Sequence, residues 1–171
     1  MELWLVRHGP AEEIDPRRWP RDDDRPLTGA GAALVRRVAP VLARAIGGPR
    51  VIATSPAARA RATAELLAAA FDPPAPIEGW AELAPGAPAP PVLHRLIPRA
   101  HAGRLLPVVV GHAPTIHELV GLAVAGEPVE LVRIPRGGAG RLEFPAVPRP
   151  RSATLAGPWS PEEILAGAIR A

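Results

Sequence analysis

Two histidines stand directly after short apolar runs, each beside residues that could bind an anion. The run at 3–6 leads into Arg7 and His8, and the run at 107–110 leads into His112. Apolar runs of this length predict buried strands, and an unpaired charge is costly inside a strand, so these side chains belong at strand ends. In open α/β sheets the carboxyl ends of the strands form the edge where ligands bind. We therefore expect His8 and His112 at one site.

A third candidate, Arg59, follows the strand predicted at 50–54. The Ser-Pro pair after this strand predicts the start of a helix at 56–71, with Arg59 in its first turn. Helical side chains lean toward the helix N-terminus, so Arg59 is expected to reach back to the same strand edge. Arg61 lies about 200° around the helix from Arg59, which favours a solvent-facing position.

Together these side chains suit the chemistry of a phosphoryl group. Arginine guanidinium groups pair bidentately with phosphate oxygens and stabilise the charge of an in-line displacement. A neutral imidazole can attack phosphorus and carry the phosphoryl group covalently, and positive neighbours keep it neutral by lowering its pKa. The chain has no cysteine and no dense cluster of carboxylates and histidines. Metal-independent phosphoryl transfer is the reaction that fits best.

The elements that must position these residues alternate along the chain. Thr28 is the predicted N-cap of a helix that is kinked at Pro40 and ends at Gly47, and Ser160 is the predicted N-cap of a final short helix. The other predicted elements are a short strand near Ile77, helices at 92–100 and 114–124, strands at 131–134, 141–144 and 152–155, and a hairpin-like turn at 137–140. This order predicts a single three-layer α/β/α domain over 1–171 with a mainly parallel central sheet.

Composition narrows the class of protein. The chain has 171 residues, 47% hydrophobic and 22% charged, which is ordinary for a soluble domain. No apolar run is long enough to span a bilayer and no signal peptide is recognisable, so we expect a cytoplasmic protein without a membrane partner. All 20 basic residues are arginines, but they are scattered and aromatic residues make up only 4%, so nucleic acid is not an expected partner.

Several other polar residues could carry function. Asp22, Asp23 and Asp24 lie in a long polar segment at 9–26. A segment this long is more often functional than idle, and we expect it to cover or flank the site. A metal site there is conceivable, but no spaced set of ligands surrounds it, so we expect these carboxylates to face water. The remaining histidines are expected in solvent, because His94 and His101 do not follow strands and His117 lies off the apolar face of its helix.

Three segments resemble the motifs of the histidine phosphatase (phosphoglycerate-mutase-like) superfamily. The first is Leu5-Val6-Arg7-His8-Gly9, the second spans 55–64 from Ser-Pro to Thr-Ala, and the third is Val110-Gly111-His112-Ala113-Pro114-Thr115. Arg25-Pro26-Leu27-Thr28, Gly31 and the small size are similar to the short bacterial phosphohistidine phosphatases of the SixA type. The likeness spans nearly the whole chain and implies a phosphoglycerate-mutase-like fold.

The resemblance implies a role for each residue. His8 corresponds to the phosphorylated nucleophile, and Arg7, Arg59 and His112 correspond to the phosphate pocket, with no metal and no cofactor. Glu82 falls in a segment similar to the Glu-Leu-x-Pro of the short subfamily, where larger members place a general acid.

Two departures from the larger enzymes bear on the substrate. The segment 10–14 lacks the Asn that mutases carry after Arg-His-Gly, and the helical insertions that enclose small sugar phosphates are missing. An open site suits phosphohistidine in a protein, because a protonated phosphoimidazole needs little help from a general acid. Two alternatives stay open, a phosphatase of small phosphoesters or nucleotides and a non-catalytic module that binds phosphorylated ligands.

Overall fold

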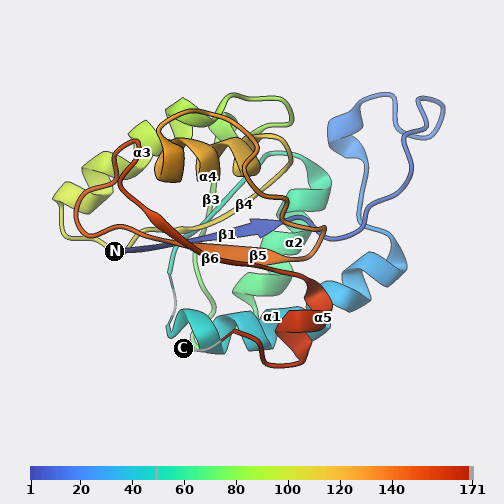
Figure 1. Ribbon diagram of the computed structural model, residues 1–171. Helices are drawn as coiled ribbons and strands as arrows, with labels where there is room; N and C mark the ends of the chain where they lie inside the picture. The colour runs from blue at the N-terminus through green and yellow to red at the C-terminus, as the bar shows by residue number, and fades with distance from the viewer. Residues whose placement is uncertain (49, 170–171) are drawn as a thin grey trace.

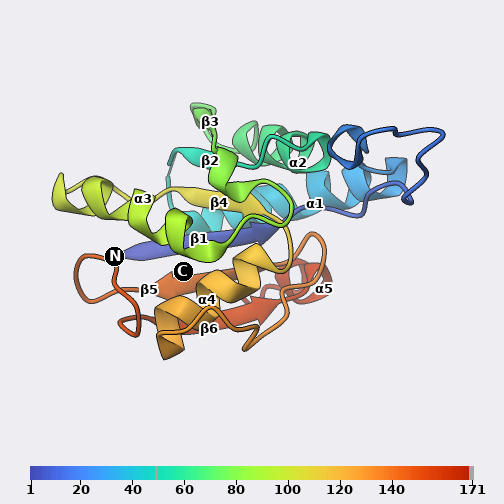
Figure 2. The same ribbon diagram turned by 90° about the horizontal axis from the view of Figure 1, so that it is seen from above.

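A mixed sheet of six strands forms the centre of the molecule in the computed structural model (Figure 1), which describes residues 1–48 and 50–169. The strands are β1 (Glu2–Arg7), β2 (Ile52–Thr54), β3 (Ile77–Gly79), β4 (Val108–Gly111), β5 (Ala139–Glu143) and β6 (Thr154–Trp159). Their order is β3-β2-β4-β1-β5-β6, as the view from above shows (Figure 2). The first four in this order are parallel, β5 is antiparallel to β1, and β6 is antiparallel to β5, so the prediction of a mainly parallel sheet is confirmed.

Helices cover both faces of this sheet, which confirms the predicted three layers (Figures 1 and 2). They are α1 (Gly29–Ile46), α2 (Ala58–Ala68), α3 (Ala89–His101), α4 (Thr115–Ala125) and α5 (Pro161–Leu165), with single 3-10 turns η1 (Asp22–Asp24) and η2 (Ala81–Leu83). One apolar core lies between the sheet and α3 with α4, and the other lies beneath α1, α2 and α5. Within the described residues, no helix combines the length and apolar character needed to cross a membrane.

The helix starts follow from local hydrogen bonding. Thr28 caps α1, because its side chain accepts from the Gly31 backbone N–H, and Ser160 caps α5 in a complete capping box. The helix α1 continues through Pro40 and ends at Gly47, whose φ of 77° is in the left-handed region. The predicted start of α2 is shifted, since its N-cap is Ala57 and its first helical residue is Ala58.

The strand predicted at 131–134 is wrong, because no strand lies there. The turn predicted at 137–140 lies two residues earlier, where the Gly138 N–H donates to the Pro135 carbonyl, and β5 begins at Ala139. Residues 126–138 instead form an irregular connection between α4 and β5, which we call the 126–138 loop. Its end pairs with the end of β1: Gly137 N–H points to the carbonyls of Arg7 and His8, and Arg7 N–H donates to the Gly138 carbonyl. These backbone groups are satisfied without another strand. The last strand, predicted at 152–155, lies at 154–159.

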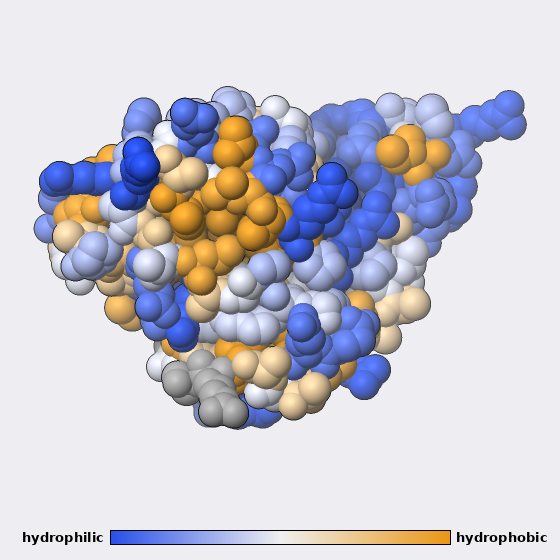
Figure 3. All heavy atoms as spheres, in the orientation of Figure 1, coloured by the Kyte–Doolittle hydropathy of each residue, from blue (hydrophilic) through white to orange (hydrophobic). Residues whose placement is uncertain are grey.

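The polar segment between β1 and α1 projects from one end of the molecule (Figure 1). An isolated antiparallel bridge between Ala11 and Leu27 joins its two ends. The turn η1 lies in the part of the segment that leads back to α1. In Figure 3 this end of the molecule is mostly hydrophilic, whereas the middle of the face shown carries an apolar patch. The segment is therefore anchored at its base, and η1 is brought back toward the start of α2, with which it is in contact.

Candidate active site

Parallel pairing of β1 and β4 brings the two predicted histidines together. Arg7 lies opposite Gly111 in the strand register, so His8 and His112 are the next residue along each strand. Their ring centroids are 4.9 Å apart with an interplanar angle of 52°. Both histidines are buried, since 6% of the surface of His8 and 3% of that of His112 is exposed.

His8 is held in the form that a nucleophile requires. Its Nδ1 lies 2.7 Å from the Gly9 carbonyl, which can only accept, so Nδ1 carries the proton and Nε2 has the free lone pair. Burial, reinforced by the charges of Arg59 and Arg7, lowers the pKa of His8 to about 4 against the hydrogen bond to Gly9. The imidazole is therefore neutral near pH 7.

His112 is oriented by the hydroxyl group of Ser55. Its Nε2 lies 2.9 Å from Ser55 Oγ, which also accepts from the Ala57 backbone N–H at 3.2 Å. Within the described residues, His112 Nε2 is the one acceptor for the Ser55 hydroxyl proton, so we assign the ring proton of His112 to Nδ1. Burial lowers the pKa of His112 to about 3, with further lowering by His8 and Arg59.

The two predicted arginines are fixed through their outer nitrogens. Arg7 Nη1 donates to the Ile134 carbonyl at 3.1 Å, and Arg59 donates to the Asp22 carbonyl at 2.7 Å and to its carboxylate at 2.8 Å. The predicted positions are confirmed here for Arg59, which is 3% exposed, and for Arg61, which is exposed. The structure thus presents two ordered guanidinium groups near the histidine pair, as the charge effects on His8 require.

Three donors of these residues lack a hydrogen-bond partner. In the described part of the chain six buried side-chain polar atoms have none, and they include Arg7 Nε, Arg59 Nε and His112 Nδ1. A buried donor left unpaired costs about 1–3 kcal/mol. Three such donors around a neutral His8 make a site suited to a multiply charged oxyanion, whose oxygens can accept from all of them.

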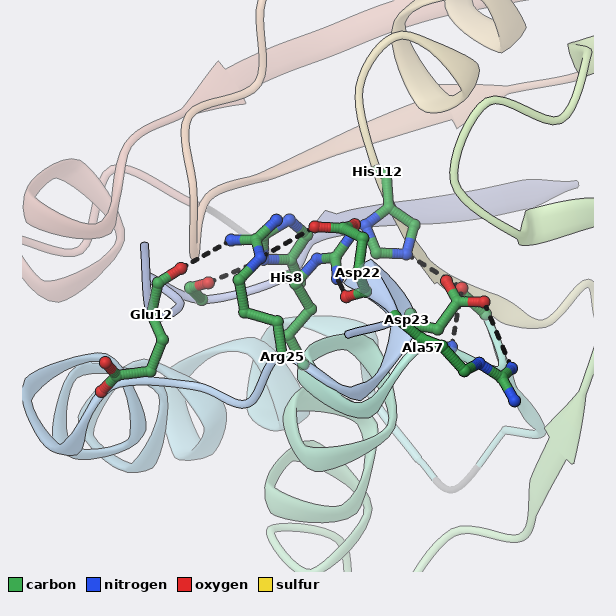
Figure 4. A network of polar contacts seen from close by, with 11 residues as sticks. His8, Glu12, Asp22, Asp23, Arg25, Ala57 and His112 are labelled. Atoms are coloured by element: carbon green, nitrogen blue, oxygen red, sulfur yellow. Dashed lines mark hydrogen bonds and ion pairs between the residues drawn. The ribbon is translucent and has the colours of Figure 1, made fainter. Parts of the chain in front are cut away.

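Asp22 is exposed, as predicted, but its carboxylate is also paired with two arginines, which the prediction missed. Its carboxylate accepts from Arg25 Nε at 2.9 Å and from Arg59 Nη2 at 2.8 Å, while Arg25 Nη1 donates to the Glu12 carbonyl at 2.7 Å (Figure 4). Although burial opposes it, hydrogen bonds and charges of the two arginines lower the pKa of Asp22. Figure 4 shows Asp22 gathered with His8 and His112, so η1 forms one wall of the site.

Glu82 lies in η2, and its carboxylate is bound elsewhere. Both of its oxygens accept from Arg95 Nη1, at 2.8 and 2.7 Å, and the Arg95 guanidinium lies 4.5 Å from the Trp80 ring centroid. A backbone hydrogen bond and the bond from Arg95 lower the pKa of Glu82. An ionised carboxyl group has no proton to donate. The general-acid role of Glu82 stays a prediction, and this geometry counts against it.

Further residues of the site were missed by sequence reasoning. Thr63 Oγ1 accepts from the Gly9 backbone N–H at 3.1 Å and donates to the Arg59 carbonyl at 2.7 Å, which joins α2 to the end of β1. Arg136, in the 126–138 loop, is close enough for its charge to lower the pKa of both Arg7 and His8. The helical spacing of Thr63 from Arg59 was a usable signal, whereas nothing local distinguishes Arg136.

The other three histidines differ in their exposure to solvent. His94 and His101 are exposed on α3, as predicted, but the prediction for His117 is wrong, because it is 2% exposed beneath the 126–138 loop. Over residues 1–48 and 50–169, no group of three or more His, Cys, Asp or Glu residues is placed to hold a metal ion.

Sequence comparison identifies the family. The model of the histidine phosphatase superfamily (branch 1) matches residues 3–87. An uncharacterized protein of Picosynechococcus sp. is 33% identical over 151 residues, which is 81% of this chain and 82% of the relative.

Solved structures share the fold over nearly the full length. The structure of the protein histidine phosphatase SixA complexed with tungstate superposes with a TM-score of 0.80 at 23% identity, covering 96% of this chain and 99% of that one. A putative phosphohistidine phosphatase SixA from Agrobacterium tumefaciens gives 0.69 at 25% identity, covering 92% and 97%. The chain therefore belongs to the histidine phosphatase superfamily, and it is an enzyme of this phosphatase class with a SixA-type fold.

Proposed function

We propose that this enzyme removes phosphoryl groups from phosphohistidine in a protein, through a phosphohistidine intermediate on its own His8. One observation carries the proposal. A buried, neutral His8 with its Nε2 lone pair free lies beside unpartnered donors of Arg7, Arg59 and His112. This combines a nucleophile and a receptor for phosphate oxygens in one site.

In the first half-reaction, the arginines and His112 bind the phosphate oxygens and His8 Nε2 attacks phosphorus. A new N–P bond forms to His8 while the N–P bond to the substrate imidazole breaks, and its electron pair stays on the leaving ring. The guanidinium groups of Arg7 and Arg59 stabilise the charge on the equatorial oxygens. Because His8 Nδ1–H donates to the Gly9 carbonyl, the ring stays oriented as it becomes positively charged.

In the second half-reaction, water attacks the phosphorylated His8. The oxygen of water bonds to phosphorus, the N–P bond to His8 breaks, and inorganic phosphate leaves with the protons of water. His8 returns to its neutral state, which its low pKa favours near pH 7. No metal or cofactor takes part in this proposal.

The leaving group favours phosphohistidine as the substrate. A phosphoimidazole that is protonated on its second nitrogen leaves as a neutral ring and needs no proton from the enzyme. The carboxyl groups of Glu82 and Asp22 are held ionised by arginines, so neither is poised as a donor. The names of the SixA structures point to the same class of substrate.

The test compares wild type with H8A on a chemically phosphorylated histidine protein and on p-nitrophenyl phosphate. We expect H8A to lose turnover of both, and wild type to form an acid-labile, alkali-stable phosphoenzyme that H8A cannot form. H94A, altered at an exposed histidine on α3, is the matched control and should keep full activity. Wild-type turnover by H8A would falsify the mechanism.

A substrate panel separates the alternatives. A higher kcat/KM for sugar phosphates or nucleotides than for the phosphohistidine protein assigns the enzyme to small phosphoesters. Phosphate binding without turnover of any substrate identifies a binding module instead.

A further inference from the structure

His117 is a buried polar residue that the proposed mechanism does not use. It lies in the first turns of α4 with 2% of its surface exposed. Both ring nitrogens contact the 126–138 loop: Nδ1 is 2.7 Å from a Glu130 carboxylate oxygen, and Nε2 is 3.1 Å from the Ile134 backbone nitrogen. One imidazole therefore joins two points of a loop that contains no strand.

The chemistry of the partners fixes the tautomer. The backbone N–H of Ile134 can only donate, so Nε2 of His117 accepts and carries no proton. The ring proton then lies on Nδ1 and is donated to the Glu130 carboxylate, a charge-assisted bond. With this tautomer, the 3.3 Å approach of Nε2 to the Ile134 carbonyl is not a hydrogen bond.

The same residue of the loop holds Arg7. The Ile134 carbonyl accepts from Arg7 Nη1 at 3.1 Å, so His117 binds the N–H and Arg7 binds the C=O of Ile134. In the described residues Arg7 has no ion-pair partner, and its Nε is one of the buried donors without a hydrogen-bond partner. The position of the Ile134 carbonyl thus decides where this guanidinium lies.

We propose that His117 is a positioning residue for Arg7, acting through Ile134, with Glu130 holding the required tautomer. The inference rests on the proposed function, in which Arg7 binds the phosphoryl group. Metal ligands that are imidazoles are oriented by their outer partners in the same manner. Here the oriented group is a guanidinium, and a backbone amide transmits the constraint.

Orthovanadate binding, measured by calorimetry on the full chain, tests the proposal. Asn at 117 retains a donor near Nδ1 but does not reach Ile134, whereas the carbonyl oxygen of Gln lies near the position of Nε2 and can accept from Ile134 N–H. We expect H117N to weaken vanadate binding about tenfold and H117Q to stay within about threefold of wild type. The control H94N changes an exposed histidine and should bind as wild type does.

A double-mutant cycle separates positioning from a general structural effect. If His117 acts through Arg7, then H117N has less than about a twofold effect when added to R7Q. An equal effect in both backgrounds overturns the inference but leaves the phosphate pocket intact. An R7Q variant that binds vanadate like wild type overturns the pocket itself, and with it the inference.

A measurement on wild type covers the case in which H117N does not fold. In ¹⁵N-edited spectra of the imidazole groups, His117 should show a protonated Nδ1 and an unprotonated Nε2 at neutral pH. A protonated Nε2 shows that the Ile134 N–H bond is not made, and the inference then fails.

Discussion

The nucleophilic nitrogen of His8 is available only while its imidazole is neutral, and burial determines when that is so. Its pKa is lowered from 6.5 to about 4, mainly by burial and then by Arg59 and Arg7. We therefore expect kcat/KM for p-nitrophenyl phosphate, corrected for substrate ionisation, to fall only as the pH approaches 4. An acid limb centred near 6.5 would contradict this. Circular dichroism at each pH separates loss of activity from unfolding.

Arg59 and Arg61 form a natural matched pair, because both lie on α2 two residues apart. Arg59 is 3% exposed and its unpartnered Nε belongs to the proposed pocket, whereas Arg61 is exposed. We expect R59A to lower kcat/KM on the order of 10²–10³-fold, as loss of a preorganised charge-stabilising donor does. R61A should stay close to wild type. Similar losses in both variants would indicate a nonspecific electrostatic effect instead.

At the residue scale, the sequence predicted those side chains whose place follows from a strand end. His8 and His112 come directly after buried strands, and Arg59 lies one helical turn beyond another. Asp22 could not be placed in this way, because it lies in the irregular segment between β1 and α1 and its partner Arg59 is 37 residues away. His117 was misplaced because it lies off the apolar face of its helix, and its partners Glu130 and Ile134 come from a loop whose residues 131–134 were predicted as a strand.

At the scale of elements, the start of α1 is in close backbone contact with the segment that follows β1. A Cβ atom built on Gly31 would lie 2.0 Å from the Pro10 carbonyl oxygen, whereas one on Gly29 would meet nothing within 4 Å. Both are in the first turn of the helix, where Ala is ordinarily favoured over Gly. We expect G31A to destabilise the protein by about 1–3 kcal/mol and to lower activity by displacing the segment after His8. G29A should unfold at or above the wild-type temperature in a thermal scan, and equal behaviour of the two variants would refute the close contact.

Element prediction succeeded where the hydrophobic pattern and the caps agreed, and failed where tertiary contacts supplied the hydrogen bonds. Thr28 and Ser160 cap their helices as predicted. The segment at 131–134 reads as a strand, but the side chain of His117 takes the Ile134 N–H and Arg7 takes its carbonyl, so the backbone has partners outside the sheet. No local pattern contains this information, because both partners lie far away in sequence.

At the scale of the whole molecule, the buried histidine pair couples the stability of the fold to pH. In the folded protein the pKa of His8 is about 4 and that of His112 about 3, against 6.5 for an unperturbed imidazole. Below pH 6.5 the unfolded chain binds protons that the folded chain does not, so stability is highest above 6.5 and falls with decreasing pH.

At pH 5 the two histidines together should lower the free energy of unfolding by about 4 kcal/mol relative to pH 7. Urea midpoints at the two pH values measure this loss, since carboxyl groups with lowered pKa values contribute mainly below pH 5. The H8N/H112N double variant should lose most of the difference, and a wild-type midpoint that does not change would show that the pair is not buried in the neutral form.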